Sequence, residues 1–265
     1  MKNLNLNFNE ERYYYLNYNP YELGFMRKRT RGFASITASI LHEYYNNRGG
    51  GNAIIEIGIG GGGPQIGLRE CLNNDVPVYG VDIFDPEVIL DNEKMYIKGL
   101  NSFKNATTMA AEVQNDNFSL FWGSNGYSKE TVEKIVAYNH NNKMGVVIDD
   151  GDTNLGALNG LGFWKDQLDD SGYIITEGPF GNGIEPVWNI YQDPVQRTAA
   201  LKKCSELNQM VIFDCHHLKF DPNRSVDYVV PYLGIYTKDW ASLRNSKFHE
   251  LFSPYIVEGR QYYDA

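Results

Sequence analysis

The sequence is poor in cysteine and in long apolar runs, and each scarcity narrows what the chain can be. Only three cysteines occur among 265 residues, Cys71, Cys204 and Cys215. None of them forms a CxxC pair, which argues against a structural zinc site and fits reduced thiols inside a cell. No stretch reaches the ~18 apolar residues of a membrane-spanning helix, and the Asn-rich N-terminus is unlike a signal peptide. We therefore expect a cytoplasmic protein without a membrane partner.

Basic residues are also scarce. The chain has 24 Lys and Arg against 33 Asp and Glu, which gives a formal net charge of -9. Surfaces that bind nucleic acid need clustered Lys and Arg. The one basic cluster, over residues 27–31, is short and is typical of a solvated helix start. We expect no nucleic-acid partner.

The pattern along the chain predicts an α/β fold, and 42% hydrophobic residues are enough for a sizeable core. After a poorly periodic arm over 1–30 and a helix over 32–47, apolar runs alternate with helical segments, which favours a parallel sheet covered on both faces. Seven strands are predicted, over 53–58, 76–83, 118–122, 145–149, 173–176, 210–215 and 228–237. Helices are predicted between them over 64–73, 87–115 in pieces, 129–141, 160–168 and 193–207.

The last two predicted strands break this alternation. The turn-rich segment between them has no room for a helix, so they should pair as an antiparallel hairpin. We predict a Rossmann-like, doubly wound sheet of seven strands, mostly parallel, with a C-terminal antiparallel hairpin. Residues 1–48 form an N-terminal arm and helix in this interpretation, and 49–265 form the main domain.

A glycine-rich loop follows the first predicted strand. Gly58, Gly60 and Gly63 satisfy G-x-G-x-x-G, which is weak evidence alone. Glycine permits a tight turn and lets backbone N–H groups approach a ligand at a helix N-terminus. Asp82 ends the next strand and can accept hydrogen bonds from ribose hydroxyls. Loop and acid together indicate an adenosine-containing ligand, and the alternative is a structural turn with a surface aspartate.

The acid Glu56 helps to distinguish between two classes of adenosine-containing ligands. A nicotinamide-binding strand usually runs apolar into its first glycine, whereas here an acid comes two positions earlier, in EIGIG from Glu56 to Gly60. This resembles the E/D-x-G-x-G signature of class I S-adenosylmethionine-dependent methyltransferases, whose seven-stranded sheet agrees with the predicted strands. The resemblance covers roughly residues 50–240. It implies S-adenosylmethionine as cofactor, with Glu56 near its methionine portion, Gly58 and Gly60 in the loop that contacts it, and Asp82 on its ribose.

Two later segments extend the resemblance. FSLFWGSNGYS, over 118–128, stands where the family places the loop that touches the adenine, which makes Ser124 or Asn125 the implied contact. VVIDDGD, over 146–152, is the fourth strand and its exit. Ligands of parallel α/β sheets sit at the carboxyl ends of the strands, so its acids should lie near the methyl group.

These acids are Asp149, Asp150 and Asp152, with Asp149 counted among the cofactor contacts. The alternative interpretation of adjacent aspartates is a helix cap in a solvated turn.

Three segments carry a narrower resemblance, to methyltransferases that depend on a metal ion. DIFDP, VVIDDGD and GYIITEG look like the metal-dependent sugar O-methyltransferases of the macrocin and mycinamicin type. That resemblance implies Asp150 and Glu177 as ligands of a divalent cation such as Mg²⁺, with Asp150 in the catalytic site. Thr153 stands where the family has its histidine base, and Gly178 stands where it has a second acid.

The base that accepts a proton in the reaction can instead be His216 or His217, which follow the sixth predicted strand. If that strand is parallel to the others, they face the same edge of the sheet as the other predicted site residues. The alternative is a histidine pair in a surface turn. The tyrosine-rich arm is expected to cover the site or to form a contact in a homo-oligomer.

The sequence thus predicts an S-adenosylmethionine-dependent O-methyltransferase acting on a hydroxyl of a small molecule or saccharide, assisted by a metal. Two alternatives stay open. One is a nicotinamide-dependent oxidoreductase. The other is a homologue that binds the cofactor and has lost the chemistry, as Thr153 and Gly178 indicate.

Overall fold

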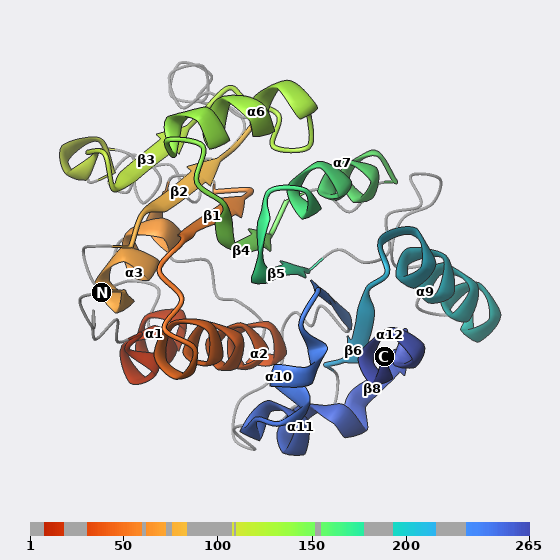
Figure 1. Cartoon of the computed structure of the whole chain (residues 1–265). Helices are drawn as coiled ribbons and strands as arrows, with labels where there is room; N and C mark the ends of the chain where they lie inside the picture. The colour runs from red at the N-terminus through yellow and green to blue at the C-terminus, as the bar shows by residue number, and fades with distance from the viewer. Residues whose placement is uncertain are drawn as a thin grey trace.

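A computed structural model gives the fold (Figure 1). It describes residues 8–18, 31–59, 62–72, 76–83, 108, 110–151, 155–177, 193–215 and 232–265. Several residues with a predicted role lie outside the described residues: Gly60, Asp152, Thr153, Gly178, His216 and His217.

The described strands form one mostly parallel sheet, which confirms the predicted α/β class. The strands are β1 (Ala53–Ile57), β2 (Val78–Val81), β3 (Phe118–Phe121), β4 (Met144–Asp149), β5 (Leu168–Thr176), β6 (Val211–Asp214), β7 (Tyr232–Thr237) and β8 (Ile256–Glu258). Their order is β3-β2-β1-β4-β5-β7-β6-β8. β1 to β5 pair in parallel, and β7 runs antiparallel to both β5 and β6. The predicted terminal hairpin is therefore present, and β6 runs parallel to β5.

Strand order reverses between β1 and β4. The chain continues outward from β1 to β2 and β3 on one side, and from β4 to β5 on the other. In open parallel sheets such a reversal separates the connections at the carboxyl ends of the two central strands, and ligands bind there.

Helices cover both faces of the sheet (Figure 1). One face packs against α1 (Glu10–Tyr18), α2 (Arg31–Leu41), α3 (Gly63–Cys71), α10 (Trp240–Arg244), α11 (Lys247–Phe252) and α12 (Arg260–Asp264). The other face packs against α6 (Lys129–Tyr138), α7 (Leu155–Lys165) and α9 (Pro194–Asn208). A π-helical segment, His42–Asn47, extends α2 toward β1. Because both faces are covered, the central strands are apolar at nearly every position. None of the described helices has the length and apolar character needed to span a bilayer.

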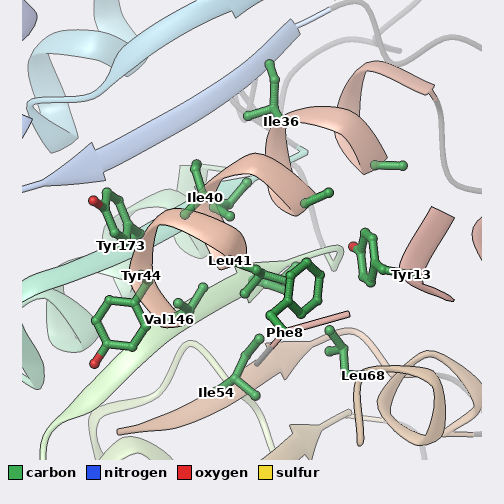
Figure 2. Packing of buried hydrophobic residues seen from close by; sticks show 14 of the residues in the cluster. Phe8, Tyr13, Ile36, Ile40, Leu41, Tyr44, Ile54, Leu68, Val146 and Tyr173 are labelled. Carbon is green, nitrogen blue, oxygen red and sulfur yellow. The ribbon is translucent and has the colours of Figure 1, made fainter. Parts of the chain in front are cut away.

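Alternation along each strand divides the core into two clusters. Ile54 and Val146 belong to the cluster under α2 and α3, whereas Ile55 and Val147 belong to the cluster under α6 and α7. Figure 2 shows the first cluster, in which Ile40 of α2 lies close to residues of the sheet. This division fixes which way each side chain at the carboxyl ends of the strands points.

The N-terminal arm is helical over α1, where the prediction had a poorly periodic segment. Phe8, Tyr13 and Leu16 are buried in the first core cluster. The Phe8 N–H donates to Asn46 Oδ1 at 2.6 Å, and Asn46 Nδ2 donates back to the Phe8 carbonyl at 3.0 Å. The many tyrosines and asparagines of this segment obscure the periodicity of its apolar residues in the sequence. The division at residue 48 stays a prediction.

Two other predictions were wrong in detail. The described sheet has eight strands, since the short β8 pairs antiparallel with β6. The helix predicted over 160–168 spans Leu155–Lys165, and Leu168 already begins β5. Three glycines in α7 concealed its start, and the polar residues Asp169, Asp170 and Ser171 concealed the start of β5.

Candidate functional site

The carboxyl ends of β1, β2, β4 and β5 lie side by side, and most of the described site residues follow them. Hydrogen bonds of 2.9 Å extend the ladder one residue beyond the strands, from the N–H groups of Gly58, Asp150 and Glu177 to the carbonyls of Val81, Ile57 and Asp149, respectively. The structure thus brings the exits of four neighbouring strands together at one edge of the sheet.

Glu56 is completely buried in β1, on the face covered by α3. Its Oε2 accepts a hydrogen bond of 2.5 Å from Nε2 of Gln65, which is also fully buried. A buried carboxylate needs such a partner, because transfer out of water is costly for an unpaired charge. Gln65 was not among the site residues predicted from the sequence. Its position in the first turn of the helix after the glycine loop was the available signal.

The glycine loop needs glycine at two described positions. Gly58 has φ +87°, and a Cβ there would lie 2.5 Å from the Asp150 carbonyl oxygen. Gly62 has φ +91° and caps α3, with Pro64 in the first turn of the helix. A side chain at Gly58 would therefore separate the exits of β1 and β4.

Asp82 follows β2 and is 7% exposed. Its N–H donates to the Phe121 carbonyl at 3.1 Å, and its own carbonyl accepts from the Ser124 N–H at 2.9 Å. The next residue, Ile83, is 64% exposed. An exposed isoleucine beside a carboxylate offers an apolar surface next to hydrogen-bond acceptors. Ile83 was not among the site residues predicted from the sequence, although it directly follows Asp82.

The loop after β3 lies against the end of β2, through the Ser124 contact with Asp82. Asn125 Oδ1 accepts from the Tyr127 N–H at 3.0 Å, so its side chain shapes the loop itself. The hydroxyl of Ser124 donates a long hydrogen bond of 3.4 Å to the Trp122 carbonyl. The predicted adenine contact at Ser124 or Asn125 stays a prediction.

Asp149 ends β4 and points to the face opposite Glu56, toward α6 and α7. The side chain is 2% exposed. Its Oδ1 accepts from the Tyr127 hydroxyl at 2.6 Å and from the Gly151 N–H at 3.3 Å, and its Oδ2 accepts from Thr176 Oγ1 at 2.7 Å. Burial raises the pKa of this carboxyl to about 6, against the lowering effect of the hydrogen bonds. Asp149 therefore joins the loop after β3 to the ends of β4 and β5, and its predicted cofactor contact stays a prediction.

The two predicted metal ligands follow neighbouring strands, Asp150 after β4 and Glu177 after β5. In the part of the chain that the structure describes, no group of three or more His, Cys, Asp or Glu side chains is placed to hold a metal ion. Metal binding at this pair stays a prediction.

Cys215 follows β6 and is buried and free, as are Cys71 and Cys204. Burial raises the pKa of the Cys215 thiol well above its ordinary value, and the negative charges of Asp214 and Glu177 raise it further. Buried cysteines of this kind are unreactive compared with exposed, low-pKa thiols. Because β6 runs parallel to β5, Cys215 lies at the same edge of the sheet as Glu177.

Comparisons with known proteins give similarity of structure without similarity of sequence. No family model matches the sequence, and no curated protein does. Human methyltransferase-like protein 13 in complex with SAH is similar, with 12% identity, a TM-score of 0.47, and coverage of 89% of this chain and 91% of that chain. CalS11, a calicheamicin methyltransferase, has 13% identity, a TM-score of 0.44, and coverage of 86% and 91%. An S-adenosylmethionine-dependent O-methyltransferase from Thermotoga maritima has 12% identity, a TM-score of 0.43, and coverage of 83% and 69%.

These structural neighbours are methyltransferases, but at such low identities and TM-scores the likeness carries no argument about activity.

Proposed function

We propose that this protein is an S-adenosylmethionine-dependent methyltransferase that acts on a hydroxyl of a small molecule or saccharide. The observation that carries the proposal is the placement of two acids. Glu56 lies at the end of β1 and Asp82 directly after β2, and these strands pair in parallel with Ile57 opposite Val81. Both acids stand at the carboxyl edge of the sheet, beside the reversal of strand order where such sheets bind ligands.

The residues at this edge fit the cofactor. The Asp82 carboxylate is an acceptor suited to the two ribose hydroxyls. Ile83, which is 64% exposed, supplies an apolar surface for the adenine, with Ser124 or Asn125 on the neighbouring loop. Glu56 is a buried negative charge suited to the ammonium group of the methionine portion.

Gly58 and Gly60 would let the backbone approach that portion closely. Asp149 would contribute to the same site from the end of β4. In the described structure it already fixes the loop after β3, which carries the predicted adenine contacts.

The bound cofactor supplies an electrophilic methyl group on a sulfonium centre. The protein contributes by holding the acceptor oxygen in line with that group and by excluding water. The acceptor hydroxyl must also lose its proton. We propose that His216 or His217 receives it, since they follow β6 by two and three residues in the sequence and β6 runs parallel to β5.

A divalent cation would be held by Asp150 and Glu177. Mg²⁺ prefers oxygen ligands and keeps several waters, so two carboxylates suffice for a weak site. Such an ion would orient the acceptor oxygens and favour loss of the hydroxyl proton. Asp152, two residues beyond Asp150, is a candidate for a third oxygen.

The test is turnover of the cofactor with a panel of saccharides and phenols, with and without EDTA. The His216→Ala/His217→Ala double variant is compared with wild type. Loss of activity in EDTA alone supports the metal as the group that activates the hydroxyl, and loss in the double variant alone supports the histidines. Full activity under all conditions contradicts both assignments.

Binding of the cofactor without turnover of any acceptor would support the homologue that has lost its chemistry. Binding of NADH in place of the methyl donor would support an oxidoreductase and refute the proposal.

A further inference from the structure

We propose that Gln65 is a positioning and binding residue for the amino-acid portion of the cofactor. Its amide N–H group holds the Glu56 carboxylate, and its carbonyl oxygen accepts a hydrogen bond from the ammonium group of the ligand. This inference rests on the proposed function and assigns a specific chemical role within that site.

The first observation is the contact between the two side chains. Gln65 Nε2 donates to Glu56 Oε2 at 2.5 Å, and neither residue is exposed. A hydrogen bond to an ionised acceptor is shorter and stronger than one between neutral groups. The contact joins β1 to the first turn of α3 and therefore bridges the two ends of the glycine loop.

The second observation is the space in which Gln65 lies. Gly80 of β2 pairs directly with Glu56 in the sheet. A Cβ at Gly80 would lie 3.1 Å from Gln65 Cγ and closer still to the side chains of Ile59 and Leu120. The missing side chain at Gly80 thus leaves room for the stem of Gln65 beside Glu56. Packing on this scale fixes the glutamine rotamer, which a binding residue requires.

The third observation concerns the other end of the amide. A carboxylate only accepts hydrogen bonds, so the NH₂ group of Gln65 must face Glu56 and the carbonyl oxygen must point elsewhere. That oxygen, Oε1, is buried and has no hydrogen-bond partner within the described ranges. A buried acceptor left without a donor is unfavourable. The geometry therefore calls for a ligand that donates hydrogen bonds.

An ammonium group meets this requirement. It has three N–H donors and no acceptor, and its charge is opposite to that of Glu56. A carboxylate or phosphate group would be repelled by Glu56, and an apolar group would leave Oε1 unsatisfied. Because the methionine portion of the proposed cofactor carries an α-amino group, the pair would recognise that portion and not the adenosine.

The test compares two ligands that differ only in this portion. S-adenosylhomocysteine carries the amino acid, whereas 5′-methylthioadenosine keeps the adenosine and sulfur and lacks it. Both are titrated by calorimetry into wild type and Gln65→Leu. We expect the variant to bind S-adenosylhomocysteine roughly 10-fold or more weakly, as for loss of a hydrogen bond to a charged group. The affinity for 5′-methylthioadenosine should stay unchanged.

Gln196→Leu is the matched control. Gln196 occupies the third position of α9 after its cap Asp193, as Gln65 does in α3 after Gly62, but it is exposed. This variant should bind both ligands as wild type does.

A swapped variant covers the case in which Gln65→Leu fails to fold. Glu56→Gln/Gln65→Glu keeps one carboxylate and one amide in contact but moves the charge from β1 to α3. We expect a native circular dichroism spectrum and a selective loss of S-adenosylhomocysteine binding. Equal losses for the two ligands, or undiminished binding of S-adenosylhomocysteine in these variants, would overturn the role of Gln65. A wild type that binds neither ligand would refute the proposed function itself.

Discussion

Replacing Asp149 by asparagine should change how the stability of the protein depends on pH. The substitution keeps the size of the side chain and removes its charge. Tyr127 and Thr176 both donate to the carboxylate in the native protein. A hydroxyl can also accept, so one of them can rotate to receive the new amide N–H. The variant should therefore fold.

The magnitude follows from the pKa of Asp149. Burial raises it from 3.8 in the unfolded chain to about 6 in the native protein. The native state then binds the proton more tightly than the unfolded state does. The stability from this group is fully present below pH ~4 and is lost as the pH rises through ~6. A difference of about 2 pKa units corresponds to about 3 kcal/mol of unfolding free energy.

The assay is urea unfolding followed by tryptophan fluorescence at several pH values between 4 and 7.5. The free energy of wild type minus that of Asp149→Asn should fall by about 3 kcal/mol across this range, and other carboxyls cancel in the difference. Asp116→Asn makes the same change at an exposed aspartate before β3 and is the matched control. A flat difference for Asp149→Asn, or one that grows with pH, would refute the raised pKa.

Three further predictions concern single residues near the same edge of the sheet. Tyr127→Phe removes a hydrogen-bond donor to the Asp149 carboxylate, so the pKa of Asp149 should rise further. In the same pH series of urea unfolding, the loss of stability should then occur at higher pH, and an unchanged pH dependence would contradict this. Gly58→Ala should lower the unfolding free energy by about 1–3 kcal/mol or more, because φ at this position is positive and the added Cβ would meet the Asp150 carbonyl oxygen. Equal urea midpoints for the variant and wild type would contradict this. The buried Cys215 thiol should resist a thiol-specific reagent in native buffer and react in urea, and rapid native labelling would contradict its burial.

The mostly parallel sheet, its antiparallel hairpin and the positions of its acids were predictable from the sequence. Apolar runs ending in glycine or aspartate mark the strands and their exits, and parallel pairing brings these exits together. Glu56 and Asp82 could therefore be placed at one edge before any coordinates were known.

Side-chain partners were not predictable in the same way. The hydrogen bond from Gln65 to Glu56 depends on the space left by Gly80 on a different strand, which no local pattern encodes. The direction of Asp149 followed from strand alternation, but its enclosure by Tyr127 depends on the packing of the loop after β3. The short β8 was missed because three residues give no usable periodicity.

Equilibrium binding of S-adenosylhomocysteine tests the central claim most directly. Calorimetric titration of wild type should give a dissociation constant in the low micromolar range. This constant corresponds to a binding free energy on the order of 8 kcal/mol. Asp82→Ala should weaken binding by about 1–3 kcal/mol through loss of the ribose hydrogen bonds. Asp116→Ala, at the amino end of β3 and away from this edge, should leave it unchanged. Absence of binding to wild type, together with binding of NADH, would contradict the assignment of this edge as a site for S-adenosylmethionine.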